Sequence, residues 1–213
     1  MLDRILLSLK SHAVGLDISD QAVRLVSLRK HGGRLYLRHA CQASLPSGAV
    51  VDQIVQQPEV VSVALQTLMK RHRLGKPRVV IAAAERHTQT HILSLESVAR
   101  SLDPLALEQE VLAELDAHID HAIEDFYIDF QMVASDAVSD NDFAVEVKCV
   151  SKSLYDNTLS ALRQAHMVPQ IMDIAPLALQ HNPWQDIEVD ANSVLEGCEN
   201  DYALSAALAM RGV

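Results

Sequence analysis

The chain has 213 residues, of which 49% are hydrophobic and 22% charged, the composition of a folded globular protein. This length is enough for one ordinary domain or two small ones with a sizeable core. The formal net charge of −10 argues against a nucleic-acid-binding protein, because such proteins need positive surface to neutralise phosphates. Three widely spaced cysteines, Cys41, Cys149 and Cys198, form no CxxC pair, which argues against a disulfide framework or a zinc site and fits a reducing compartment.

The first ten residues place Leu2, Ile5, Leu6 and Leu9 at helical spacing. The segment is too short to cross a bilayer and lacks the small-residue cleavage site of a secretory signal. Two interpretations remain open: the stripe docks on the chain's own domain, or it touches a membrane surface or a partner.

The next part predicts an antiparallel meander followed by a helix and a buried strand. The predicted strands are residues 14–18, 22–28, 35–39 and 78–84. Gly32 and Gly33 predict the turn between the second and third strands, since glycine accepts positive φ. Pro58 opens the helix, which we expect to end near Gly75.

A second block predicts strand, helix, strand, strand. Its strands are residues 88–95, 126–133 and 143–150, the last two joined as a hairpin by turn residues at 139–142. Asp103 is the expected N-cap of the helix, with Pro104 after it.

The remaining elements are a helix at 154–166, a strand at 169–174, the start of a helix at 175–179, a loop at 181–200 and a helix at 201–210. Without the second block, the order matches a ribonuclease H-like α/β unit, a meander followed by crossover helices feeding parallel strands. We therefore predict a core of residues 1–85 and 152–213, with an α+β insertion at 86–151.

Several segments resemble the PilM and FtsA branch of actin-like proteins. Residues 14–26, which contain Gly15-Leu16-Asp17-Ile18, resemble the opening strand and turn of that branch. Four further segments resemble PilM in the same order, namely residues 32–34, the single stretch formed by 45–46 and 49–52, residues 168–179 and residues 202–212. Each motif alone is weak, whereas five in register are fairly specific.

The resemblance implies the first half of an actin-like fold, in which an inserted subdomain replaces the usual actin one. It also implies a partner, because PilM proteins bind the short cytoplasmic N-terminus of PilN, an inner-membrane protein, in a groove between core and insertion. Our candidate residues for this groove are Arg86, His87, Thr88, Thr90, Pro169, Ile171 and Asp173. An extended peptide could add there as a strand to an exposed sheet edge.

Two departures from the family bear on nucleotide binding. Full-length relatives carry a second α/β half between the segment ending near Leu179 and the terminal helix, but the span of about twenty residues here is far short of the roughly 100 that such a half needs. Ser19 also replaces the glycine that lets backbone amides approach phosphates. We therefore expect a degenerate phosphate loop at Asp17, Ser19 and Gln21, and no cofactor.

Several polar residues fit either a chemical role or a plainer structural one. Asp17 is either a turn-capping residue or a Mg²⁺ ligand, and a two-metal nuclease would need it to meet Glu59 or Asp173. His118 and His121 are either a metal-binding pair or solvated surface. The run from Lys70 to Arg78 either complements a helix end or binds phosphate.

The sequence thus predicts a non-enzymatic cytoplasmic adaptor of type IV pilus or competence machinery, peripheral at the inner membrane through its partner, with no metal site. The alternatives are a residual ATP- and Mg²⁺-binding switch and, less favoured, a metal-dependent ribonuclease H-like nuclease. We expect the apolar stripe of 201–210 to pack on the core. A surface that the missing half would have covered needs another occupant, so a homodimer is a further hypothesis.

Overall fold

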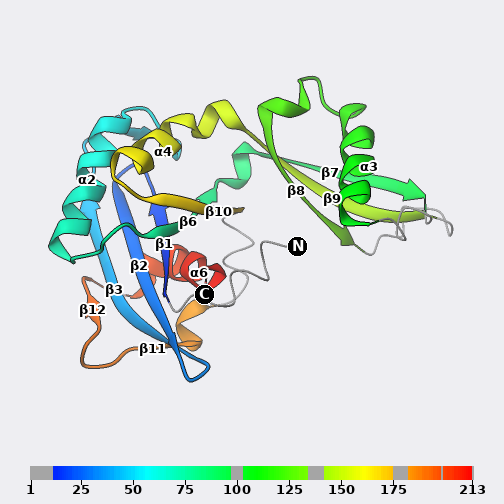
Figure 1. Ribbon diagram of the computed structural model, residues 1–213. Helices are drawn as coiled ribbons and strands as arrows, with labels where there is room; N and C mark the ends of the chain where they lie inside the picture. The colour runs from blue at the N-terminus through cyan, green and yellow to red at the C-terminus, as the bar shows by residue number, and fades with distance from the viewer. Residues whose placement is uncertain (1–11, 97–102, 134–141, 175–181, 198, 213) are drawn as a thin grey trace. The chain divides into compact units, whose positions relative to one another are not determined.

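The computed structural model describes residues 12–96, 103–133, 142–174, 182–197 and 199–212 (Figure 1). The predicted N-terminal stripe, the helix at 175–179, most of the turn at 139–142 and Cys198 lie outside these residues. The chain divides into two compact units, one of residues Arg86–Leu154 and one made of the segments on either side. Each unit is described by itself.

The core unit is built on one sheet with the strand order β10-β6-β1-β2-β3-β11, in which β11 is the short strand Ile187–Glu188. The principal strands are β1 (His12–Ile18), β2 (Ala22–His31), β3 (Arg34–Ser44), β6 (Arg78–Ala83) and β10 (Val168–Ile174). The first three pair antiparallel, whereas β6 is parallel to β1, and β10 is parallel to β6. This meander with added parallel strands is the order predicted for a ribonuclease H-like, actin-type α/β unit.

The β2–β3 hairpin is longer than the sequence pattern predicted. Its pairing runs from Ala22 opposite Ser44 to His31 opposite Arg34. Gly32 and Gly33 both have positive φ, 58° and 81°, so they form a two-residue turn that keeps the strands paired to their ends.

Of the described residues, three helices cover the two faces of this sheet (Figure 1). They are α2 (Pro58–Arg71), α4 (Lys152–Gln164) and α6 (Ala203–Arg211). Leu65 of α2 and Leu162 of α4 are buried in one cluster with Leu16, Leu25 and Ile81. Side chains of α6 pack on the other face, in clusters with Val26, Leu28 and Val80. The alternation of inward side chains along each strand produces these two core layers.

The terminal helix packs on the core, as predicted from its stripe. Five of its residues are buried, namely Ser205, Ala206, Ala207, Leu208 and Ala209. It begins at Ala203 rather than at the predicted Asp201, because Glu199–Tyr202 forms a 3₁₀ turn, η5.

The sequence pattern missed several short strands. Residues 181–200 were expected to form a loop, but they contain η4 (Pro183–Gln185), β11 (Ile187–Glu188) and β12 (Val194–Leu195), and both strands pair parallel to β3. Glu196 then forms an ion pair with Arg71 at the end of α2. A hairpin of β4 (Val50–Val51) and β5 (Ile54–Val55) was also missed, since two-residue strands have no periodicity.

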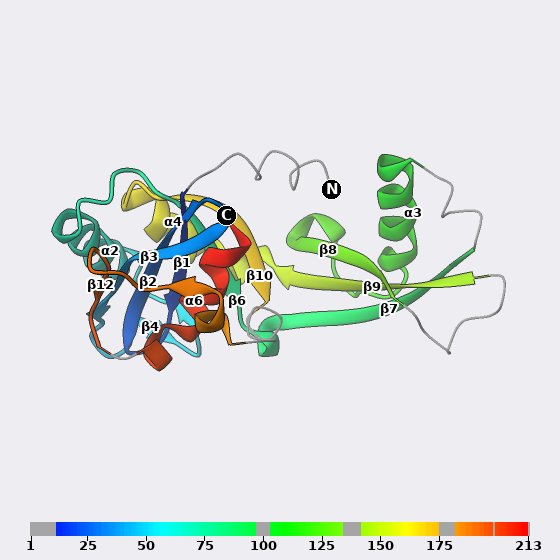
Figure 2. The same ribbon diagram turned by 90° about the horizontal axis from the view of Figure 1, so that it is seen from below.

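The second unit has the predicted order of strand, helix, strand, strand. Its elements are η1 (Glu85–His87), which leads into it, β7 (Thr88–Glu96), α3 (Pro104–Asp116), η3 (Ile123–Asp125), β8 (Phe126–Val133) and β9 (Asp142–Ser151). The strands form an antiparallel sheet in the order β7-β9-β8, and Figure 2 shows α3 on one face of it. Asp103 is the predicted N-cap, since its carboxylate accepts hydrogen bonds from the amides of Leu105 at 3.0 Å and Ala106 at 3.1 Å.

Among the described residues, no helix has both the length and the apolar character needed to span a bilayer.

Candidate functional site

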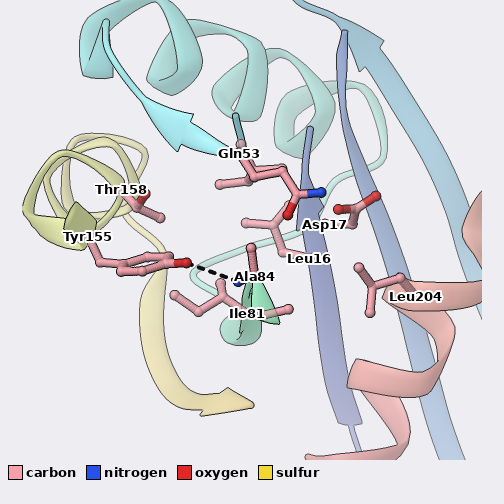
Figure 3. A pocket seen from close by; sticks show the side chains of 10 residues that line it. Leu16, Asp17, Gln53, Ile81, Ala84, Tyr155, Thr158 and Leu204 are labelled. Atoms are coloured by element: carbon pink, nitrogen blue, oxygen red, sulfur yellow. Dashed lines mark hydrogen bonds between the residues drawn. The ribbon is translucent and has the colours of Figure 1, made fainter. Parts of the chain in front are cut away.

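A pocket lies in the core unit at the carboxyl ends of β1 and β6 (Figure 3). Its lining residues are Leu16, Asp17, Ile18, Gln53, Ile81, Ala82, Ala84, Tyr155, Thr158 and Leu204. Open α/β sheets commonly bind ligands outside the carboxyl ends of their strands. The position and the mixed polar and apolar lining make this pocket the candidate site.

Tyr155 fixes one wall of the pocket. This residue is 2% exposed, and its hydroxyl accepts a hydrogen bond of 3.0 Å from the amide of Ala84 (Figure 3). This bond joins the first turn of α4 to the end of β6. The two sides of the pocket that these elements form are therefore held together by a buried contact, although the elements are far apart in sequence.

Asp17 is the only carboxylate among the described residues of the lining. It stands opposite Arg24 in the β1–β2 register, and the guanidinium of Arg24 lies 3.4 Å from its Oδ2. Burial raises the pKa of Asp17, while the charge and hydrogen bond of Arg24 act in the opposite direction. The prediction that Asp17 caps the turn was wrong, because its side chain pairs with Arg24 across the hairpin. A carboxyl group with a raised pKa in a pocket is a candidate for function.

Ser19 closes the β1–β2 turn in place of Asp17. Its amide donates a hydrogen bond to the carbonyl of Ala22 at 3.0 Å, and its hydroxyl donates to the same carbonyl at 2.9 Å. The hydroxyl also accepts a hydrogen bond of 3.2 Å from Arg24. Phosphate loops bind through amides that are free of such bonds, so the amide and hydroxyl of Ser19 are already occupied.

Gln21, the third residue of the predicted phosphate loop, is not part of the pocket lining. Its side chain is exposed, and its carbonyl accepts the amide of Leu45 at 2.8 Å. The structure therefore places only Asp17 of the three predicted residues in the pocket.

Asp20 organises the site and was missed from the sequence. Its carboxylate accepts hydrogen bonds from the amides of Asp52 at 3.1 Å and Gln53 at 2.9 Å. Both residues have positive φ, 52° and 63°, in the turn of the β4–β5 hairpin, a conformation unfavourable for residues other than glycine. The bonds hold this turn where Gln53 lines the pocket.

The pocket chemistry is that of hydrogen bonding rather than charge neutralisation. In the part of the chain that the structure describes, its polar side chains are those of Asp17, Gln53, Tyr155 and Thr158, and none of the lining residues is a lysine or arginine. A triphosphate needs cations and metal ions to offset its charge. The described lining residues offer a phosphate no cation, and Arg24 already contacts Asp17 and Ser19.

The carboxylates considered for a nuclease have other positions. Asp173 forms a 2.9 Å ion pair with Arg211, and Glu59 is exposed in the first turn of α2. Within the part of the chain that the structure describes, no group of three or more His, Cys, Asp or Glu side chains is arranged to hold a metal ion. His118 bonds to the carbonyl of Glu114 within its own helix end, at 2.9 Å.

The predicted partner-binding residues belong to different units. Arg86 and His87 lie in η1, and Thr88 and Thr90 in β7, whereas Pro169, Ile171 and Asp173 lie on β10 of the core. The grouping of the two sets around one peptide therefore stays a prediction. Each set nevertheless lies on or beside a strand at the edge of its described sheet.

Comparison with known proteins decides the family. The sequence model described as type IV pilus assembly protein PilM matches residues 15–212. The chain belongs to this family. A solved structure described as the PilM-PilN type IV pilus biogenesis complex is 25% identical, with a TM-score of 0.63 over 78% of this chain and 48% of the matched chain. The present chain thus spans about half the length of that relative.

A second solved structure is the cytoplasmic domain of EpsL, an inner-membrane component of the type II secretion system of Vibrio cholerae. It is 13% identical, with a TM-score of 0.45, and the match covers 79% of this chain and 59% of that one.

The PilM assignment confirms the family predicted from the short motifs. The match includes the opening Gly15-Leu16-Asp17-Ile18 motif and the terminal helix. In the structure, Gly15 of that motif contacts the terminal helix directly, as a Cβ at position 15 would overlap the backbone of Ser205 and Ala209. Two motifs at opposite ends of the sequence therefore form one packing contact.

Proposed function

We propose that this PilM family member is a non-enzymatic cytoplasmic adaptor in type IV pilus assembly that binds the N-terminal tail of a PilN-like inner-membrane protein. The observation that carries the proposal is the family match over residues 15–212, together with 25% identity to a chain of a PilM-PilN complex. An adaptor of this kind is held at the inner membrane by its partner and needs no membrane span of its own.

The edge strands support capture of an extended tail. Among the described strands, β10 pairs only with β6, and β7 pairs only with β9. An edge strand presents unpaired amides and carbonyls, to which an extended peptide can add. Residue Pro169 on β10 is compatible with this position, since proline within sheets is confined to edges, strand starts and bulges.

The lining of the pocket supports a role without catalysis. The lining residues that the structure describes include one carboxylate and no cation, and the Ser19 amide is already bonded. One observation favours the alternative of a residual nucleotide switch, namely the partly buried Asp17 with its raised pKa at the carboxyl end of a central strand. A thermal melt with ATP and Mg²⁺ distinguishes the adaptor from the nucleotide switch, because any ligand that binds the native state raises its melting temperature.

The decisive experiment is calorimetry with a synthetic peptide of the N-terminal tail of the PilN-like protein from the same genome. We expect saturable heat with the native peptide and none with a scrambled peptide of the same composition. Peptides N-methylated at alternate backbone amides test strand addition, because methylation removes the donor without changing the side chain. One alternate set is expected to lose binding and the other to keep it.

Absence of heat with the native peptide, at protein concentrations where the chain is folded, contradicts the proposed partner. Equal loss with both methylated sets contradicts strand addition but not the partner itself.

A further inference from the structure

The negative charge of the chain is concentrated in one unit. Residues 86–154 contain 14 Asp and Glu and four Lys and Arg, a net charge of −10, whereas the remaining residues contain 14 of each sign. The whole formal net charge therefore lies in the inserted unit. The core is neutral overall, so part of its surface can be positive.

The core has such a surface, which we name the basic patch. It consists of the exposed residues Lys70, Arg73, Lys76, Arg78 and Arg163. No acidic residue occurs between Glu59 and Glu85 or between Asp156 and Asp173. Arg71 is left out because it pairs with Glu196. Among the described residues, no member of the patch forms an ion pair.

Hydrogen bonds bring together the two segments of the patch, residues 70–78 and the end of α4. The side chain of Gln66 on α2 donates to the carbonyl of Gln164 at 2.9 Å, next to Arg163. The amide of Val168 donates to the carbonyl of Pro77 at 2.9 Å, and Val168 is opposite Arg78 in the β6–β10 register. The patch therefore lies where β6 and β10 begin, at the opposite end of these strands from the pocket.

Helix capping accounts for only part of this charge. Lys70 is in the last turn of α2, where a cation complements the exposed carbonyls. The dipole effect falls off within that turn, yet Arg73, Lys76 and Arg78 follow it in the chain. Arg163 is in the last turn of α4 and complements that helix end in the same way. The other three cations have no role at a helix end, and an unpaired cluster of one sign attracts an oppositely charged surface.

The inserted unit has a surface of the matching sign on α3. Its exposed carboxylates are Glu108, Glu110, Glu114 and Asp116, and the sequence has no lysine or arginine between Arg100 and Lys148. Leu105 at the start of the same helix is 64% exposed, which adds apolar area beside the carboxylates.

We propose that the basic patch binds the acidic face of α3 on a second copy of the chain. Each copy then offers both halves of a head-to-tail contact, which is heterologous and closes into a ring or extends as a filament. Two copies repel each other through their net negative charges. At physiological ionic strength this repulsion is screened beyond about 8 Å, so the interaction between two copies is governed by the charges that come into direct contact. An anionic membrane would attract the patch but repel the unit that carries −10, which favours the second copy.

Charge-reversal variants test this proposal by sedimentation velocity at high micromolar concentration. The patch variant is Lys70→Glu with Arg73→Glu and Lys76→Glu, and the α3 variant is Glu108→Lys with Glu110→Lys and Glu114→Lys. We expect the native chain to self-associate, and each variant alone to associate at least about tenfold more weakly, since rim charges of one sign then face each other. An equimolar mixture of the two variants restores opposite charges at both contacts and is expected to associate again.

Melting curves and circular dichroism of both variants establish that they are folded. A native chain that is monomeric throughout, or a mixture of variants that does not associate although each is folded, overturns the proposal. Vesicles containing phosphatidylglycerol provide the competing outcome: binding that the patch variant loses, by a chain that stays monomeric, would assign the patch to an anionic membrane instead. Calorimetry with the PilN-like peptide is expected to be the same for the native chain and both variants, which separates this inference from the proposed function.

Discussion

Gly15 on β1 lies so close to Ser205 on α6 that a Cβ at position 15 would be 1.9 Å from the Ser205 carbonyl oxygen. It would also be 2.4 Å from the amide nitrogen of Ala209. Both neighbours are backbone atoms, which cannot rotate away as a side chain can. The glycine is therefore required because it lets α6 rest directly on the central strand of the sheet.

We predict that Gly15→Ala lowers the free energy of unfolding by roughly 3 kcal/mol, the upper part of the range for overpacked cores. Urea denaturation followed by circular dichroism measures the change. Gly75→Ala is the matched control, since a Cβ at Gly75 meets nothing within 4 Å, and we expect its effect to be within about 0.5 kcal/mol of zero. Equal effects of the two substitutions would show that α6 does not depend on this contact.

A second prediction concerns the carboxylate that holds the β4–β5 turn. Asp20→Ala removes the acceptor of the Asp52 and Gln53 amides, and we expect it to cost about 1.5–3 kcal/mol of stability, as hydrogen bonds to a charged group do. Replacing Gln53 by glycine relieves the unfavourable positive φ. Thus Asp20→Ala is expected to be less damaging in a Gln53→Gly background than in the native chain, and the double-mutant cycle measures the difference.

Additivity of those two substitutions would contradict the coupling between Asp20 and the turn. Gln56→Gly, in the same segment but without positive φ, serves as the control background.

The sequence predicted the elements whose periodicity is long enough to recognise. Val79, Val80 and Ile81 indicated a buried strand, and Asp103 followed by Pro104 indicated a helix start, because both patterns are local in sequence. The short pairs β11 and β12 have no such period, so the part of the chain that contains them was predicted to be a loop. They are ordered through pairing with β3 and through Glu196, which meets Arg71 from 125 residues away.

The candidate site was predictable at Asp17 but not around it. Its partner Arg24 follows from the register of a tight β1–β2 hairpin, in which the two residues are directly opposite, and counting back from the turn would have found it. Asp20, in contrast, binds residues 32 and 33 positions away, and Tyr155 bonds to Ala84 from 71 positions away. Neither contact leaves a periodic pattern in the sequence.

A third prediction is that two buried cysteines are inert. Burial raises the pKa of Cys41 to about 12 and also raises the pKa of Cys149, and both side chains are 0% exposed. The thiolate is the reactive form, so we expect iodoacetamide at mildly alkaline pH to leave both residues unmodified in the native chain and to modify both in urea. Peptide mass spectrometry measures the modified fraction at each site, and rapid modification of Cys41 without denaturant would contradict the structure around β3.

The last prediction follows from the raised pKa of Asp17, which burial causes against the opposing charge of Arg24. Unfolded chains release this proton near the ordinary pKa of 3.8, whereas the folded chain keeps it to higher pH. Between the two pKa values the unfolded state binds fewer protons, so stability falls as pH rises through this window. Asp17→Asn removes that cost, and we expect it to raise the free energy of unfolding at neutral pH and to converge with the native chain below pH 3.8. Asp116→Asn, at an exposed position of α3, is the control, and a loss of stability in Asp17→Asn at neutral pH would mean that the ion pair with Arg24 outweighs burial.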